Sequence, residues 1–145
     1  NGQFTDTKEL ELNVLLKQYL QDYEEVYDYR NIEVTIDEQG VFKGTMNESL
    51  AVALLTNLLK NAFVHNIDGG HIRITVTKNG ITFRNSGVEH PLNKEHIFER
   101  FYQGSKKEGS TGLGLAIADS ICRLQHLNIK YYFEQNEHCF EISQS

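Results

Sequence analysis

Residues 54–66 read LLTNLLKNAFVHN, an apolar run that predicts a buried α-helix. Its hydrophobic residues recur at the three- and four-residue steps of a helix that packs against a core. Asn57 and Asn61 interrupt this run four positions apart, so both amides lie on one side of the helix. A buried amide without a partner costs about 1–3 kcal/mol. Each of the two therefore needs a hydrogen-bonding partner or a ligand.

Two interpretations of this pair are open. Amide oxygens are suitable ligands for Mg²⁺, which takes few protein oxygens and keeps its waters and a phosphate. The alternative, which the helix alone favours, is that both amides bond backbone groups of a neighbouring loop. We expect the helix to run from a cap at Asn47 or Ser49 to about His65. Its buried arc is Leu50, Leu54, Leu58 and Ala62, with the two asparagines at the edge of that arc and Thr56 and Lys60 pointing well away from it.

Composition limits the class of protein. The 145 residues, 39% of them hydrophobic, fit one domain with a core, and we expect no apolar run long enough to span a membrane. A net charge of −6 argues against nucleic acid or an anionic membrane as the main partner, although backbone N–H groups can still bind a phosphate. Cys122 and Cys139 fall in apolar patterns, which predicts core positions in a reducing cytoplasm. The start at Asn1, without Met, suggests a fragment or a processed end.

The flanking segments predict strands and two further helices. The expected elements are a helix over 8–28, strands at 32–36 and from 41, a hairpin of 72–76 and 81–83 turning at Asn79-Gly80, a helix over 112–126, and a last hairpin in which Ile129, Tyr131 and Phe133 face Phe140 and Ile142. A polar connection over 86–111 holds the only proline and the apolar knot IFERFY at 97–102. This order predicts a mixed sheet with helices on one face.

A second polar signal ends the middle hairpin. Ile81, Phe83 and Asn85 share the inward face of one strand, so a polar residue ends an apolar row. Asn85 could meet the hydrogen-bonding edge of a nucleobase. It could equally begin a turn, because Asn-Ser-Gly favours turns.

A third signal is the run GSTGLGLAI at 109–117, in which three glycines within six residues open into a helix. Such a start lets backbone N–H groups approach a phosphate. It lacks the Gly-Lys-Ser/Thr of a P-loop, and glycine-rich helix starts also occur without a ligand. The knot at 97–102 could be part of a lid or could simply pin the loop.

Taken together and in this order, the signals resemble the ATP-binding catalytic domain of bacterial sensor histidine kinases, within the superfamily of gyrase B, the ninety-kilodalton heat-shock chaperone and mismatch-repair ATPases. LLTNLLKNAFVHN is similar to the N box, Asn85 to Gly87 to the first glycine box, IFERFY to the F box, and GSTGLGLAI to the second glycine box. The resemblance covers essentially the whole chain. It implies an α/β (α+β) two-layer sandwich of the Bergerat type, with about five strands, three helices on one face and a long ATP lid.

The resemblance also implies roles for single residues. Asn61 would coordinate Mg²⁺, Asn57 and Arg100 would be catalytic, and Arg100, with Lys106 or Lys107, would offset the charge of the γ-phosphate. The implied ATP-binding residues are Asn57, Asn61, His65, Asn85, Gly87, Phe98, Tyr102, Lys106, Gly112, Leu113, Gly114 and Leu115. The implied cofactors are ATP and Mg²⁺.

At four positions this chain carries a residue other than the one found in many members of the superfamily. ATP-hydrolysing relatives carry a glutamate base at the position of Asn57, and an amide cannot accept that proton. The chain therefore resembles a phosphoryl donor more than a hydrolase. Asn85 stands where an aspartate is usual, Glu89 replaces a glycine, and Val64 stands where a lysine is frequent. These three changes bear on nucleotide affinity.

The implied function is donation of the ATP γ-phosphoryl to a histidine on a separate dimerisation domain, in two-component signalling with a response regulator. None of the six histidines is followed by Glu, so we expect the phosphoacceptor outside residues 1–145, which form a single catalytic domain. We expect a cytoplasmic domain that contacts neither nucleic acid nor the membrane. The alternatives are a non-catalytic nucleotide-binding module and a stand-alone Ser/Thr kinase of the anti-sigma type.

Overall fold

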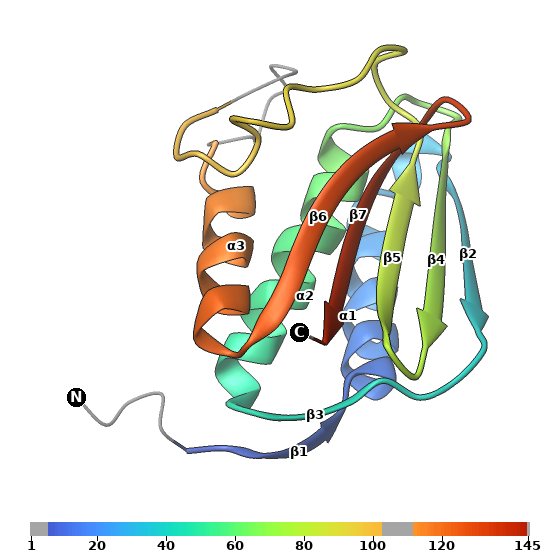
Figure 1. The fold of residues 1–145 in the computed structure, drawn as a ribbon. Coiled ribbons are helices and arrows are strands. Elements are labelled where there is room, and N and C mark those ends of the chain that lie inside the picture. Colours follow the sequence, from blue (N-terminus) through green and yellow to red (C-terminus); the bar gives the residue numbers. More distant parts are fainter. Residues whose placement is uncertain (1–5, 103–111, 145) are drawn as a thin grey trace.

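A computed structural model describes residues 6–102 and 112–144, which form a sheet with helices on one face (Figure 1). The helices are α1 (Leu12–Val26), α2 (Glu48–Val64) and α3 (Gly114–Leu124), with a 3₁₀ turn, η1 (Asp28–Arg30), after the first. The strands are β1 (Lys8–Glu11), β2 (Glu33–Glu38), β3 (Lys43–Met46), β4 (His71–Thr77), β5 (Gly80–Asn85), β6 (Leu127–Glu134) and β7 (Glu137–Gln144).

The larger sheet has five strands in the order β2-β4-β5-β7-β6, with β2 parallel to β4 and the other neighbours antiparallel. The predicted two-layer α/β architecture is thus confirmed. One expectation was wrong: residues 8–11 form β1, which pairs with β3 in a separate two-stranded sheet, instead of beginning the first helix. Pairing Leu10 with Gly44 buries the leucine to 8% exposure, a long-range contact that helical periodicity does not reveal.

The core forms between α2 and the inner face of the sheet. Leu54, Leu55, Leu58 and Leu59 of α2 are at most 1% exposed, which matches the predicted buried helix. Asn47 caps this helix, because its side chain accepts a hydrogen bond from the Leu50 amide at 3.0 Å. Ile81, Phe83 and Asn85 of β5 are 0%, 1% and 2% exposed, so Asn85 does end an inward-facing row.

Both predicted hairpins are present. In the last one Tyr131 lies opposite Phe140 and Ile129 opposite Ile142, as expected. In the middle one Gly80 belongs to β5 and pairs with Thr77, so the turn lies one residue earlier than predicted. A Cβ on Gly80 would lie 2.2 Å from the Ile142 carbonyl oxygen, so the close approach of β7 requires this glycine.

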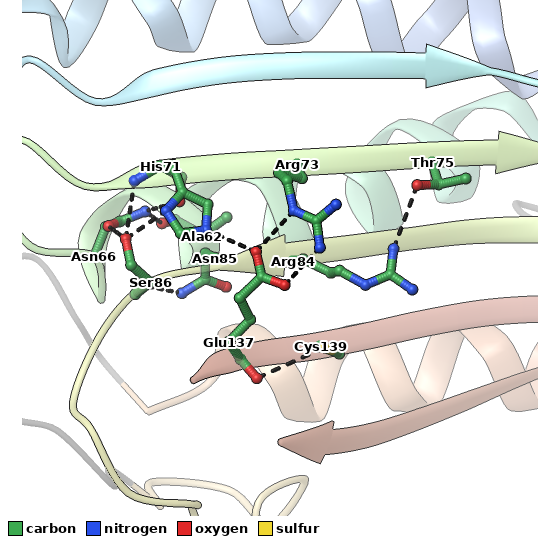
Figure 2. A network of polar contacts seen from close by, with 10 residues as sticks. All are labelled: Ala62, Asn66, His71, Arg73, Thr75, Arg84, Asn85, Ser86, Glu137 and Cys139. Carbon is green, nitrogen blue, oxygen red and sulfur yellow. Dashed lines mark hydrogen bonds and ion pairs between the residues drawn. The ribbon is translucent and has the colours of Figure 1, made fainter. Parts of the chain in front are cut away.

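The other face of the sheet carries a polar network (Figure 2). Glu137 of β7, with a side chain only 7% exposed, accepts hydrogen bonds of 2.8 and 2.7 Å from Arg73 and lies 2.7 Å from Nε2 of His71. Bonding to Arg73 and His71 outweighs burial and holds the pKa of Glu137 at about 2. The network therefore joins β4 to β7 across β5.

Cys122 and Cys139 are free and buried, as predicted for core positions. Burial raises the pKa of Cys122 to about 12 and that of Cys139 to about 11. Within the described residues, none of the helices combines the length and apolarity that crossing a membrane requires.

Candidate functional site

Two adjoining cavities lie beside α2. The larger, of about 190 Å³, lies between α2 and the start of α3, and the smaller, of about 40 Å³, extends inward to the ends of β5 and β7. Both are lined by Asn61, His65, Tyr102 and Leu115, so they form one cleft with an inner and an outer end.

Asn85 lies at the inner end. Its side-chain Nδ2 donates a 2.8 Å hydrogen bond to the Ser86 carbonyl. Its Oδ1 is buried without a hydrogen-bonding partner among the described residues. Turning the amide over would lose the bond to Ser86, so the acceptor stays directed away from that carbonyl. A buried acceptor of this kind is costly unless a ligand supplies an N–H donor, as the amino group of adenine does.

The position of Asn85 depends on a hydrogen-bonded junction behind it (Figure 2). The Ser86 hydroxyl donates to Asn66 Oδ1 at 2.6 Å and accepts from the His71 amide at 2.9 Å. Asn66 in turn donates to the carbonyls of Ala62 and His71, at 3.1 and 2.9 Å. These bonds tie the end of α2 to β4 and β5, so the inner end of the cleft has a defined geometry.

The two asparagines of α2 are half-buried at the outer end. Asn57 donates from Nδ2 to the carbonyl of Ala53, one turn earlier, at 2.7 Å. Its Oδ1 lies on the side of α3, 3.1 Å from where a Cβ on Gly114 would be. Its partner is thus its own helix and not a neighbouring loop. Asn61 lines both cavities, which leaves its amide available to a ligand.

Lys60 is exposed, as expected for a side chain that points away from the buried arc of α2, and it also lines the larger cavity. A long aliphatic stem lets a lysine border a cavity while its Cα lies on the exposed side of a helix. Val64, one turn further on, lines the same cavity with an apolar side chain. Within the described residues no group of three or more His, Cys, Asp or Glu side chains could hold a metal ion.

The glycine-rich segment closes the outer end. Gly112 has a φ of +75°, and a Cβ there would lie 2.6 Å from Cα of Phe101. The Phe101 amide donates to the Gly112 carbonyl at 2.6 Å, which joins the two ends of the connection. Gly114 begins α3, and the cavity is also lined by Leu113 and Leu115. The first backbone N–H groups of α3 therefore lie beside the cleft, where they suit an anion.

Three other predicted residues lie at or behind the walls, and a fourth, Arg100, does not line either cavity. Tyr102 lines both cavities, and Phe98 packs edge-on against Phe140 of the inner wall. Gly87 lies against α2, where a Cβ would be 2.8 Å from the His65 carbonyl oxygen. Arg100 is exposed, with its guanidinium over the ring of Phe101, so a role toward the γ-phosphate stays a prediction. Lys106 and Lys107 lie outside the described residues.

Sequence reasoning missed several lining residues. They are Lys60, Ile117, Val88, Leu92, Ile97, His138 and Phe140. The alternation of the last strand could have placed His138 inward with Phe140 and Ile142. Burial lowers the pKa of His138 and so favours the neutral imidazole at the cleft wall.

Residues 46–143 match the family of histidine kinase-, DNA gyrase B-, and HSP90-like ATPases. The chain belongs to this family. The match spans α2, the glycine-rich start of α3 and every strand of the five-stranded sheet except β2. The resemblance found in the sequence motifs is thereby confirmed, and ATP is the nucleotide that members of this ATPase family bind.

Curated relatives agree. The chain is 37% identical over 120 residues to the sensor histidine kinase RppB of Synechocystis, a match that covers 76% of this chain and 26% of RppB. It is 34% identical over 128 residues to the heme sensor protein HssS of Staphylococcus aureus strain Newman, covering 84% of this chain and 28% of HssS. The chain thus spans about a quarter of the length of these relatives.

Solved structures show the same fold. The catalytic domain of histidine kinase ThkA, in a nucleotide-free form, superposes with a TM-score of 0.84 at 25% identity, covering 94% of this chain and 93% of that domain. ThkA in complex with the response regulator protein TrrA gives a TM-score of 0.75 at 25% identity, covering 96% of this chain and 42% of ThkA.

Proposed function

We propose that this chain is the ATP-binding catalytic domain of a sensor histidine kinase and donates the γ-phosphoryl of ATP to a histidine on a separate dimerisation domain. The observation that carries the proposal is the single cleft between Asn85 and the start of α3. One end offers a buried acceptor without a partner, and the other offers backbone N–H groups. ATP matches both ends, because its adenine base carries an amino group and its phosphate chain is anionic.

At the inner end Asn85 would accept a hydrogen bond from the adenine amino group. Guanine carries a carbonyl oxygen at that position, which would oppose the Asn85 oxygen, so the cleft should prefer adenine. Gly87 supports this arrangement indirectly, because it lets the chain after β5 pass close to α2. Leu115 and Val88 supply apolar surface for the flat ring.

At the outer end Asn61 and Asn57 would present amide oxygens to Mg²⁺, which suits a cation that takes few protein ligands. When bound, this ion would offset charge on the phosphate oxygens. The N–H groups at Gly112 to Gly114 and the Lys60 ammonium would orient the phosphates, so catalysis would come from positioning and charge neutralisation. Arg100 and Lys106 are proposed to add charge near the γ-phosphate.

The amide at position 57 supports transfer to a side chain over hydrolysis. Its nitrogen already donates to Ala53, and its oxygen is too weak a base to take a proton from water. The partners we propose are a dimerisation and phosphoacceptor domain and a response regulator, in the cytoplasm where ATP is available. The regulator is suggested by the ThkA complex with TrrA.

Calorimetric titration of the chain with Mg·ATP and Mg·GTP tests nucleotide binding. We expect ATP to bind more tightly, Asn85→Ala to remove the preference, and Asn85→Asp to retain it because an aspartate oxygen also accepts. Absence of binding at millimolar ATP in a folded sample contradicts the proposal.

Phosphotransfer needs a second experiment, in which the helical dimerisation domain of the parent protein is added with γ-labelled ATP. Acid-labile, base-stable label on that domain is the expected phosphohistidine. Nucleotide binding without any label would instead favour the non-catalytic module, and acid-stable label on Ser or Thr would favour a kinase of the anti-sigma type.

A further inference from the structure

Two inward side chains beside the smaller cavity form a chain of hydrogen bonds. His138 of β7 and Tyr131 of β6 are 4% and 3% exposed. Tyr131 Oη lies 2.8 Å from His138 Nδ1 and accepts from the Leu92 amide at 3.0 Å. His138 Nε2 lies 2.7 Å from the Val88 carbonyl oxygen. The pair therefore contacts the chain between β5 and the F box at two backbone groups.

The direction of each bond follows from what each atom can do. The Val88 carbonyl only accepts, so His138 Nε2 carries the hydrogen. In a neutral ring Nδ1 is then an acceptor, so the Tyr131 hydroxyl donates to it while accepting from Leu92. All four groups are satisfied only when His138 is neutral.

The backbone held in this way is part of the cleft. Val88 and Leu92 line the smaller cavity together with Asn85 and His138, while Glu89, His90 and Pro91 between them are exposed. A short exposed segment has little packing of its own to hold its ends in place. Its two anchored ends therefore determine where the outer wall of the base-binding end lies.

We propose that the His138–Tyr131 pair is a positioning element that holds residues 88–92 as the wall of the base-binding cavity, so that nucleotide affinity requires a neutral His138. This inference rests on the proposed function, since the affinity concerned is that for ATP. His138 and Tyr131 act through the segment and need not touch the nucleotide.

Protonation would reverse the central bond of this chain. Nδ1–H would then donate to the Tyr131 oxygen, the hydroxyl hydrogen would lose the acceptor it has in the neutral pair, and a charge would be added to a buried ring. Burial lowers the pKa of His138 below its usual 6.5, the bond to the Val88 carbonyl opposes this, and nearby His90 adds to it. The other titratable groups around this cavity are Tyr131, His65 just after α2, and Tyr102. The wall should thus be held above pH 6.5 and released as pH falls through the lowered pKa.

Calorimetric titration with Mg·ATP at pH 8 and at pH 5.5 tests this for the 145-residue chain and three variants. Tyr131→Phe removes the hydroxyl and keeps the ring. Tyr132→Phe is the matched control, because the Tyr132 hydroxyl bonds Glu141 on the other face of the sheet. His138→Gln keeps one donor and one acceptor and cannot take up a proton. Hydrogen exchange of the Leu92 amide is followed in parallel without nucleotide.

We expect Tyr131→Phe to weaken ATP binding at pH 8 by about tenfold and to speed Leu92 exchange, with Tyr132→Phe unchanged. Acidification should weaken binding to the unsubstituted chain by at least about fivefold more than to His138→Gln, which separates His138 from His65. Equal affinities of the two Tyr→Phe variants, or an identical pH profile for His138→Gln, would overturn the proposal.

Two further outcomes distinguish a failure of this proposal from a failure of the proposed function. If Tyr131→Phe does not fold, the Leu92 amide of the unsubstituted chain decides: faster exchange at pH 5.5, beyond the intrinsic chemical rate, supports release of the wall, and unchanged protection refutes it. Failure of the unsubstituted chain to bind ATP at pH 8 contradicts the proposed function, whereas the exchange measurement still tests the anchoring.

Discussion

Asn57, Asn61 and Asn85 are chemically identical side chains with different surroundings. Asn57 uses its nitrogen within its own helix, Asn61 lies where two cavities meet, and Asn85 keeps a buried oxygen without a partner among the described residues. An amide carries one acceptor and two donors, so the neighbours that engage its nitrogen determine which function the oxygen can serve.

Lys60 is the residue whose role the structure changes most. Among the described residues it is the one Lys or Arg that lines the larger cavity, and Val64 lines the same cavity where a second lysine would be expected. We expect Lys60→Met to weaken Mg·ATP binding about tenfold and adenosine binding hardly at all, because the ammonium would attract phosphate charge, which adenosine lacks. Lys60→Arg, which keeps the charge, is the control. An equal loss for adenosine would point to a structural role instead.

Among the elements, α2 carries most of the site, and its C-terminal end is capped from outside. The Arg30 guanidinium of η1, only 12% exposed, donates to the carbonyls of Phe63, Val64 and Asn66 and pairs with Asp68. The last carbonyls of a helix lack i+4 partners, although the Phe63 carbonyl also accepts from the Asn66 amide at 3.3 Å. A cation at this end also suits the helix dipole.

We expect Arg30→Ala to lower the free energy of unfolding by about 2 kcal/mol, since several buried carbonyls lose their donor. Denaturant unfolding measures this. Arg30→Lys, with one compact ammonium group, should recover only part of the loss. Unchanged stability of Arg30→Ala would show that water replaces the guanidinium without cost.

Gly112, at the glycine-rich start of α3, can be compared with Gly69, which lies before β4. Gly112 and Gly69 both have a φ of +75°, but a Cβ on Gly69 meets nothing within 4 Å, whereas on Gly112 it would lie 2.6 Å from Phe101. Gly69→Ala should therefore cost about 1 kcal/mol of stability from the backbone alone and leave ATP binding intact. Gly112→Ala should cost more and weaken ATP binding at least about tenfold. Equal effects of both substitutions would contradict this account.

At the scale of the whole molecule, charged side chains on the outer face of the sheet connect β4 to β7. Glu137 holds Arg73 and His71 with a pKa of about 2, below its usual 4.5. Because the folded-state pKa is lowered, the stabilisation is complete above pH 4.5 and is lost as pH falls toward 2. The pKa difference corresponds to about 3 kcal/mol.

Acid unfolding followed by circular dichroism checks this stabilisation. Glu137→Gln should be less stable at pH 7 and should lose less stability than the unsubstituted chain between pH 4.5 and 2. Glu134→Gln is the control, since Glu134 lies opposite Glu137 at the hairpin end but is exposed. A steep acid transition retained in Glu137→Gln would assign the effect to other carboxylates.

Local sequence patterns predicted the elements well. Periodicity placed α2 in the core, alternation turned Asn85 inward, and three motifs in order indicated the nucleotide-binding family. These features depend on a few neighbouring residues, because helix and strand geometry determine which side chains share a face. The strand predicted from 41 begins at Lys43, and the helix predicted over 112–126 spans Gly114–Leu124. Two other boundaries were wrong for one reason, because β1 and Gly80 are determined by strands distant in sequence.

The partners of those side chains followed from the packing of distant elements. Arg30 reaches the end of α2, and His138 reaches the segment beyond β5, both through hydrogen bonds between residues far apart in the chain. Lys60 lines a cavity that is closed on its other side by the start of α3. A sequence pattern specifies whether a side chain faces the core or the solvent. Which donor, acceptor or charge it then meets depends on how the layers close on one another, and in this molecule that closure creates the cleft.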